Sequence, residues 1–226
     1  MSTPLSLETP LNVGSGHESL LPHDVTESLR HLLRRSTHAE HAQLNRHPLL
    51  AGITQAGYPL EHYRLLLASY MALYKSLEQG IGRFFQSTTA RFVYTPKLPW
   101  LLEDLQYFGD NPDEVASVGQ APPALFAIDT QGQLLGVLYA VEGATLGGQL
   151  IASQIAIHLG LKANAGARFF NGYGLQTAQQ WEQFLAYLER HGTDAVVRAQ
   201  AISAAKATFL RVKEALDNAQ AAAHVD

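Results

Sequence analysis

The chain of 226 residues contains no cysteine and has few charged residues. Without cysteine there can be no disulfide, no thiolate nucleophile, no zinc–thiolate site, and no cluster or prosthetic group held by a thiolate. Charged residues make up 16% of the chain, below the ~25% usual for soluble domains. The net charge of -4 provides no positive field for nucleic acid. We therefore expect any metal to be held by histidine, by carboxylate or by a bound cofactor.

Long apolar runs are also missing from the sequence. No run approaches the ~20 residues that a membrane span needs, and the N-terminus lacks the basic and apolar regions of a secretory signal. We therefore expect a cytoplasmic protein that has neither a membrane nor a nucleic-acid partner. Residues 1–22 mix serine, threonine, proline and glycine without a period, which predicts a flexible leader. The length then suits one domain over residues 23–226.

Apolar residues recur at helical spacing, and no segment alternates with period two for long enough to predict a strand. We expect a first helix that begins at Asp24 and is stopped by Pro48, since Asp is a good N-cap and Pro a helix breaker. Short helices joined by turns should fill residues 91–130. Longer helices are expected over 59–85, 134–158, 177–190 and 194–222. Gly160 should end the helix over 134–158 as a C-terminal glycine. The sequence thus predicts an all-α, single-domain bundle.

Four glycines interrupt the most apolar of these expected helices, although each costs about 0.8–1 kcal/mol relative to alanine. A helix turns by about 100° per residue, so Gly136, Ala140, Gly143 and Gly147 lie within about 60° of one another on one face. This bare stripe suits either close packing of a second helix or the approach of a flat ligand to the backbone. Spacing alone leaves both open, and the Gly147-Gly148 pair, where a helix can bend, favours the ligand slightly.

Ten histidines are present, and three of them lie between residues 38 and 47. On the first expected helix His41 lies at the flank of the buried side and His38 faces solvent. His41 is thus a candidate for the edge of a cavity, although a lone flank histidine is more often a hydrogen-bonded structural residue. The side chains of His38 and His41 differ in direction by about 60° and no third ligand accompanies them, which disfavours chelation of a metal ion by this pair. We interpret His31, His38 and His47 as solvated or capping residues.

Two segments together resemble the haem oxygenase family. LRRSTHAEH resembles the family's proximal helix, EGATLGGQLI resembles its distal helix, and LLLASYMALYKSLEQGI is similar to the helix between them. The spelling of the second motif is closest to the bacterial enzymes that supply biliverdin to bacteriophytochromes. The resemblance covers most of residues 24–220. It implies a multi-helix bundle in which haem is clamped between the two helices, with His41 as iron ligand and an open face for O2.

The resemblance implies that haem is both substrate and cofactor. With O2 and an external electron donor such as ferredoxin, haem would be cleaved to biliverdin, CO and iron, and the biliverdin would pass to a bacteriophytochrome. Gly143, Ala144 and Gly147 would shape the catalytic space. Haem-binding residues carried over from the family are Arg34, which matches a propionate-binding basic residue, together with Thr37, His41, Gly143, Gly147 and Gly148.

Several positions depart from the family's pattern. Animal enzymes have an Asp at the position of Ala144, where it organises a proton-donating water network, and a Glu at the position of Asn45, next to the proximal histidine. Met71 replaces a distal-side Tyr. No cation is found where further propionate contacts are expected, at Gln179, Gln180 and Phe184. These departures leave the orientation of haem and the cleaved meso carbon open.

Three other classes of protein are alternatives to a haem oxygenase. A di-iron oxidase needs Glu-x-x-His pairs, and no histidine here has an acidic residue three positions before it. A thiaminase-like relative would need a nucleophilic cysteine, which is absent. A non-enzymatic haem carrier or sensor would keep His41 but lack turnover, and the absence of an Asp at position 144 keeps this alternative open.

Overall fold

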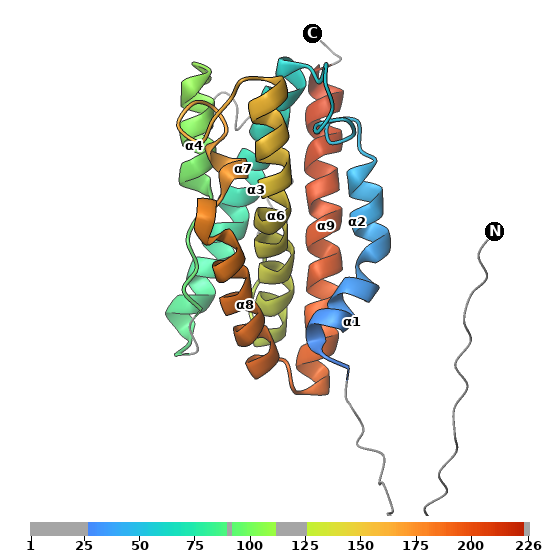
Figure 1. The fold of residues 1–226 in the computed structure, drawn as a ribbon. Coiled ribbons are helices and arrows are strands. Elements are labelled where there is room, and N and C mark those ends of the chain that lie inside the picture. The colour runs from blue at the N-terminus through green and yellow to red at the C-terminus, as the bar shows by residue number, and fades with distance from the viewer. Residues whose placement is uncertain (1–26, 90–91, 112–125, 224–226) are drawn as a thin grey trace, which may run out of the picture.

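The computed structural model describes residues 27–89, 92–111 and 126–223 (Figure 1). Within these ranges the protein is helical and contains no β-strand. The leader expected over residues 1–22 lies outside the described residues. Asp24 also lies outside them, but residues 27 and 28 are not helical and α1 begins at Leu29, so the helix start expected at Asp24 is wrong. The all-α class expected from the sequence is confirmed for the part of the chain that the structure describes.

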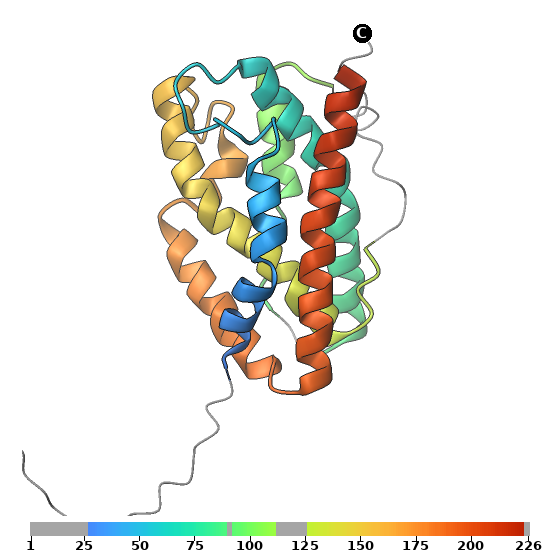
Figure 2. The same cartoon turned by 90° about the vertical axis from the view of Figure 1, so that its right-hand side faces the viewer.

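Three long helices form the centre of the molecule. α3 (Leu60–Ser87), α6 (Gln131–His158) and α9 (Ala195–Ala223) each extend over much of its length, and α3 and α6 both pack against α9 (Figures 1 and 2). α1 (Leu29–Ser36) and α2 (His38–Asn45) pack against α9, and α4 (Leu98–Tyr107) packs against α3. The bundle is completed by α7 (Arg168–Asn171), the short 3-10 helix η1 (Gly174–Gln176) and α8 (Thr177–His191).

The first expected helix is in fact two helices, so the expectation of one continuous helix up to Pro48 is wrong. Thr37 separates α1 from α2, with φ -103° and ψ 4° outside the helical region. Its buried hydroxyl donates a hydrogen bond to the carbonyl of Leu33 at 2.8 Å, and a side chain that bonds the backbone in this way tends to bend a helix. α1 begins after Ser28, whose hydroxyl accepts the N–H of His31. Because of this break, the axis of α2 has a different direction from the axis of α1.

The first half of α6 lies against α9 at very short range. A Cβ added at Gly136 would lie 2.2 Å from the carbonyl oxygen of Ala201, and one at Gly132 would lie 2.6 Å from that of Val197. Only glycine allows the two backbones to approach this closely. α6 starts with a capping box between Thr130 and Gln133 and continues as helix through the Gly147-Gly148 pair, on a curved path (Figure 2).

Among the described residues, one helix, α6, is long and apolar enough to span a membrane by length and composition alone. We expected no apolar run of this kind. More than half of its most apolar window, 56%, is buried inside the bundle. Its place between α9 and the other helices therefore accounts for its apolar character, because a helix that is covered on most sides is apolar on most sides.

Candidate functional site

A cavity of about 820 Å³ lies between α2 and α6. This volume falls within the ~300–1,000 Å³ of small-molecule sites. Its lining comes from α1, α2, residues 50–54, α3, α6, α7, α8 and α9. Aromatic rings are prominent in that lining: Tyr70, Tyr74, Tyr139, Phe169, Phe170, Trp181 and Phe209. The shape and lining suit a large, mostly apolar ligand that also meets a few polar groups.

On the α2 side of the cavity, His41 presents its imidazole ring. The ring packs edge-on against Phe209 with 5.7 Å between centroids. Partial burial lowers the pKa of His41, and the nearby His38 lowers it further. The imidazole is therefore neutral at neutral pH, which is the form that binds a metal ion.

Asn45 lies one turn after His41, with its side-chain nitrogen 3.3 Å from Nδ1 of the imidazole. If Nε2 binds a metal ion, Nδ1 carries the proton and needs an acceptor. A half-turn of the Asn45 amide presents its oxygen to Nδ1 and supplies that acceptor. Asn45 can therefore hold the ring in place for coordination, as a neutral partner rather than a charged one.

On the α6 side, Gly143, Ala144 and Gly147 line the cavity. A Cβ added at Gly147 would meet no atom within 4 Å, and one at Gly143 would meet only Trp181, at 3.8 Å. These two glycines thus expose backbone to the cavity without being required by protein packing. A flat ligand could lie directly against the main chain at this point.

The glycine stripe predicted from the sequence serves two purposes along its length. Gly136 allows the contact with α9, whereas Gly143 and Gly147 face the cavity. Gly148, which we expected at the same ligand, lies outside the lining; a Cβ there would be 2.9 Å from the carbonyl oxygen of Phe170 on α7. Helix packing and ligand approach, the two alternatives that spacing left open, therefore correspond to different glycines.

The rim of the cavity carries positive charge from α1. Among the described residues of the lining, Arg34 is the one arginine or lysine. Thr37 also lines the cavity, at the α1–α2 break. From α8, Trp181 lines the cavity. Phe184, at one of the positions where a further propionate contact was expected, is buried in the core. The position of Arg34 suits an anionic group of the ligand.

The resemblance matched Met71 of α3 to a distal-side Tyr of the family, and the structure places other side chains of α3 at the cavity. Met71 is buried, outside the cavity lining, whereas Tyr70 and Tyr74 both line the cavity. Burial raises the pKa of both tyrosines, so both stay protonated and can donate hydrogen bonds. Their spacing of four residues, in phase with Leu73 and Leu77, was the signal that could have identified this face.

The two histidines near His41 in the sequence, His38 and His47, lie in different environments. His38 is exposed on the cavity rim. His47 is buried, not solvated: its Nδ1 accepts the N–H of Leu49 at 3.2 Å, and its Nε2 lies 3.2 Å from a carboxylate oxygen of Asp217. It thus anchors the loop that reaches residues 50–54 of the lining. In the described ranges no group of three His, Asp or Glu side chains is arranged to hold a metal ion.

Comparisons with known proteins agree with this geometry. Residues 27–218 match the family model described as "Heme oxygenase". A haem oxygenase of Xanthomonas campestris pv. campestris is 30% identical over 148 residues, which are 66% of this chain and 79% of the relative.

Solved structures of haem oxygenases share the fold. The Neisseria meningitidis protein, solved with NO and CO bound, matches with a TM-score of 0.70 at 20% identity, over 86% of this chain and 92% of that one. A haem oxygenase of Synechocystis sp. PCC 6803, solved with haem and NO, matches with a TM-score of 0.71 at 20% identity over 86% of each chain. Because the family match extends over nearly all described helices, including those that carry His41 and the two cavity glycines, the chain belongs to the haem oxygenase family.

Proposed function

We propose that this haem oxygenase binds haem in the cavity between α2 and α6 and cleaves it to biliverdin, CO and iron. O2 and electrons from an external donor would be consumed. The observation that carries the proposal is that a histidine and two unobstructed glycines line one cavity of about 820 Å³ from different helices.

The residues of the cavity suit haem in three respects. His41 would bind the iron through Nε2, with Asn45 holding the ring. Gly143 and Gly147 would let the flat ring lie against the backbone of α6. Arg34 would pair with a propionate, since guanidinium and carboxylate form strong charge-assisted hydrogen bonds. Bound haem would supply the iron that binds O2 and the ring that is oxidised.

Protons have to reach the site without the carboxylate that animal enzymes place after the first distal glycine. Ala144, at that position, has no polar side chain. Tyr70 and Tyr74 line the same cavity, and their raised pKa values keep both hydroxyls protonated. We infer that these hydroxyls hold the water through which protons arrive.

The spelling of EGATLGGQLI supports a more specific role. We propose that the product supplies the chromophore of a bacteriophytochrome in the cytoplasm, with a ferredoxin as electron donor. A non-enzymatic haem carrier or sensor is the second candidate, and Ala144 favours it, because a haem site with poor proton supply could bind haem without turning it over.

Titration with haemin separates these two candidates. We expect one haemin to bind per chain and its Soret band to be replaced by bile-pigment absorption once ascorbate or reduced ferredoxin is added in air. A Soret band that persists under reductant and O2 would exclude the oxygenase and support the carrier. Failure to bind haemin at all would exclude both.

A further inference from the structure

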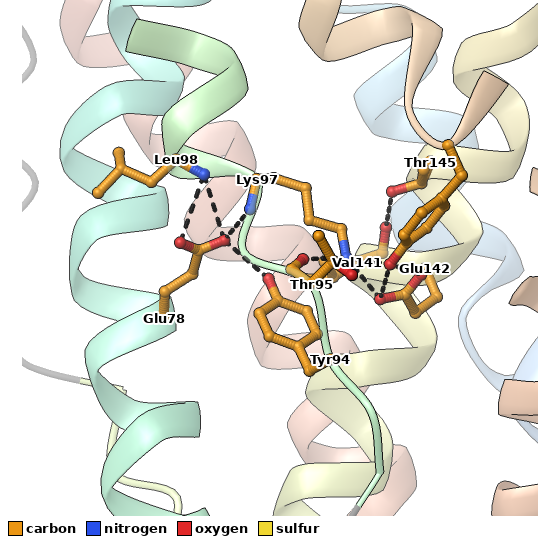
Figure 3. A network of polar contacts seen from close by, with 9 residues as sticks. Glu78, Tyr94, Thr95, Lys97, Leu98, Val141, Glu142 and Thr145 are labelled. Carbon is orange, nitrogen blue, oxygen red and sulfur yellow. Dashed lines mark hydrogen bonds and ion pairs between the residues drawn. The ribbon is translucent and has the colours of Figure 1, made fainter.

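A network of buried charged groups contacts α6 next to the cavity glycines (Figure 3). Glu142 directly precedes Gly143 but is not part of the cavity lining. Its carboxylate oxygen lies 2.6 Å from Nζ of Lys97, and each side chain is only 1% exposed. Nζ of Lys97 also donates to the carbonyl of Thr95 and to the hydroxyl of Tyr173, both at 2.8 Å. The hydroxyl of Tyr173 lies 3.2 Å from each carboxylate oxygen of Glu142.

A second carboxylate fixes the position of Lys97 from the other side. Glu78 of α3 accepts the backbone N–H of Lys97 at 2.5 Å and that of Leu98 at 3.3 Å, as well as the hydroxyl of Tyr94 at 2.9 Å. A negative charge at this point also interacts favourably with the N-terminus of α4. Lys97 thus connects three helices: α3 through Glu78, α4 at its N-terminus, and α6 through Glu142.

The energetics of such a pair indicate that stability is not its main contribution. Taking both charges out of water is costly, and replacing a buried ion pair by apolar residues of similar size is often neutral or stabilising. Breaking the pair by removing one partner is strongly destabilising, because the other charge stays buried. The pair therefore penalises any rotation or sliding of α6 that would separate Lys97 from Glu142.

The position of Glu142 on α6 makes this penalty relevant to the cavity. Glu142 and Gly143 are adjacent, so the direction of one determines the direction of the other. Helix Cα atoms lie about 2.3 Å from the axis, so a rotation of α6 by about 20° would move Gly143 by about 0.8 Å. A displacement of ~1 Å in an enzyme site can reduce the rate by about 100-fold.

We propose that the Lys97–Glu142 pair is a positioning pair that holds α6 in the one register in which Gly143 and Gly147 face the haem. The inference rests on the proposed function, since it takes haem as the ligand of the cavity. The pair acts through the helix backbone and does not itself contact the ligand. This positioning role also explains why two charges are buried beside Gly143 although apolar residues would fill the same space.

The test compares the double variant Lys97→Met/Glu142→Leu with the native protein. We expect the variant to fold and to bind haemin with a dissociation constant within about threefold of native, while kcat falls by about tenfold to 100-fold. The C–O stretching band of its ferrous CO complex should broaden or split, because α6 no longer keeps one register. Arg64→Gln/Asp110→Asn is the matched control, since it removes a partly exposed ion pair between α3 and the end of α4. The control should keep the native band and kcat.

A single native CO band together with native kcat in the folded double variant would overturn the proposal. If the double variant does not fold, Lys97→Met/Glu142→Gln provides the same comparison, because it removes both charges and leaves an acceptor for the hydroxyl of Tyr173. A native band and native kcat in this second variant would then overturn the proposal as well. A native protein that binds haemin without producing biliverdin would refute the proposed activity, whereas the CO band would still test the positioning role.

Discussion

Adding one methyl group to Gly147 should stabilise the free protein and impair its action on haem. No atom lies within 4 Å of a Cβ built at this position in the interior of α6. Alanine is favoured over glycine inside a helix by about 0.8–1 kcal/mol. In a chain of this size such a gain raises the melting temperature by about 2–4 °C. Gly147→Ala should therefore melt higher than the native apoprotein.

The same methyl group projects into the cavity that we assign to haem. It would hold a flat ligand about 1 Å or more away from the α6 backbone, a misplacement that can lower the rate by about 100-fold. Haemin titration should show weaker binding or an altered Soret band, and biliverdin formation under ascorbate should slow strongly.

Gly136→Ala is the matched control on the same face of the same helix. Its Cβ would lie 2.2 Å from the carbonyl oxygen of Ala201, a backbone atom that cannot rotate away. Overpacking of this kind typically costs about 1–3 kcal/mol, so this variant should melt lower than native while its cavity lining is unchanged. The reasoning is refuted if Gly147→Ala melts lower than native, or if it produces biliverdin at the native rate.

The remaining predictions concern the iron ligand, the propionate partner and a buried carboxyl. His41→Ala should abolish the native ligand spectrum of the haem complex, whereas His38→Ala should preserve it. Arg34→Gln should raise the haemin dissociation constant about threefold to tenfold and reduce its dependence on salt, since exposed ion pairs contribute ~1 kcal/mol and are screened. Burial raises the pKa of Asp104 from 3.8 to about 6 although it accepts two backbone N–H groups from α7. The folded state therefore binds this proton more tightly than the unfolded state, so this contribution to stability is complete below pH ~4 and is lost as the pH rises through 6, by about 3 kcal/mol. Urea unfolding should show that Asp104→Asn removes this part of the pH dependence.

Each of these has an outcome that contradicts it. A native spectrum in His41→Ala, or its loss in His38→Ala, would mean that the wrong histidine has been assigned to the iron. Unchanged haemin affinity in Arg34→Gln would remove Arg34 from the propionate site. Parallel stability curves of Asp104→Asn and the native protein between pH 4 and 7 would show that Asp104 has an ordinary pKa.

The helices themselves could be predicted because their signals are local. The expected range of 134–158 differs from α6 (Gln131–His158) by three residues at one end, and 177–190 differs from α8 (Thr177–His191) by one. Apolar periodicity and end signals act within a few residues of the chain. The break at Thr37 was missed because it depends on a hydroxyl that bonds the backbone instead of water, in a position that packing keeps buried.

Which face of a helix meets the cavity was predicted less well. Met71 was matched to a distal-side Tyr, but Tyr70 and Tyr74 line the cavity and Met71 does not. The rotation of α3 about its axis is set by side chains of other helices that pack against it, and these are not local in the sequence. The Lys97–Glu142 pair had no signal at all, since its partners are 45 residues apart.

The sequence by itself determined the helical class, the family, and the chemical groups available at the site: one flank histidine, a glycine-bearing apolar helix and no thiol. The tertiary structure alone decided how the glycine stripe is divided, with Gly136 against α9, Gly148 against α7, and Gly143 and Gly147 open to the cavity. All four glycines carry the same local information. Their roles differ because each backbone segment meets a different neighbour, and those neighbours are brought there by contacts between distant parts of the chain.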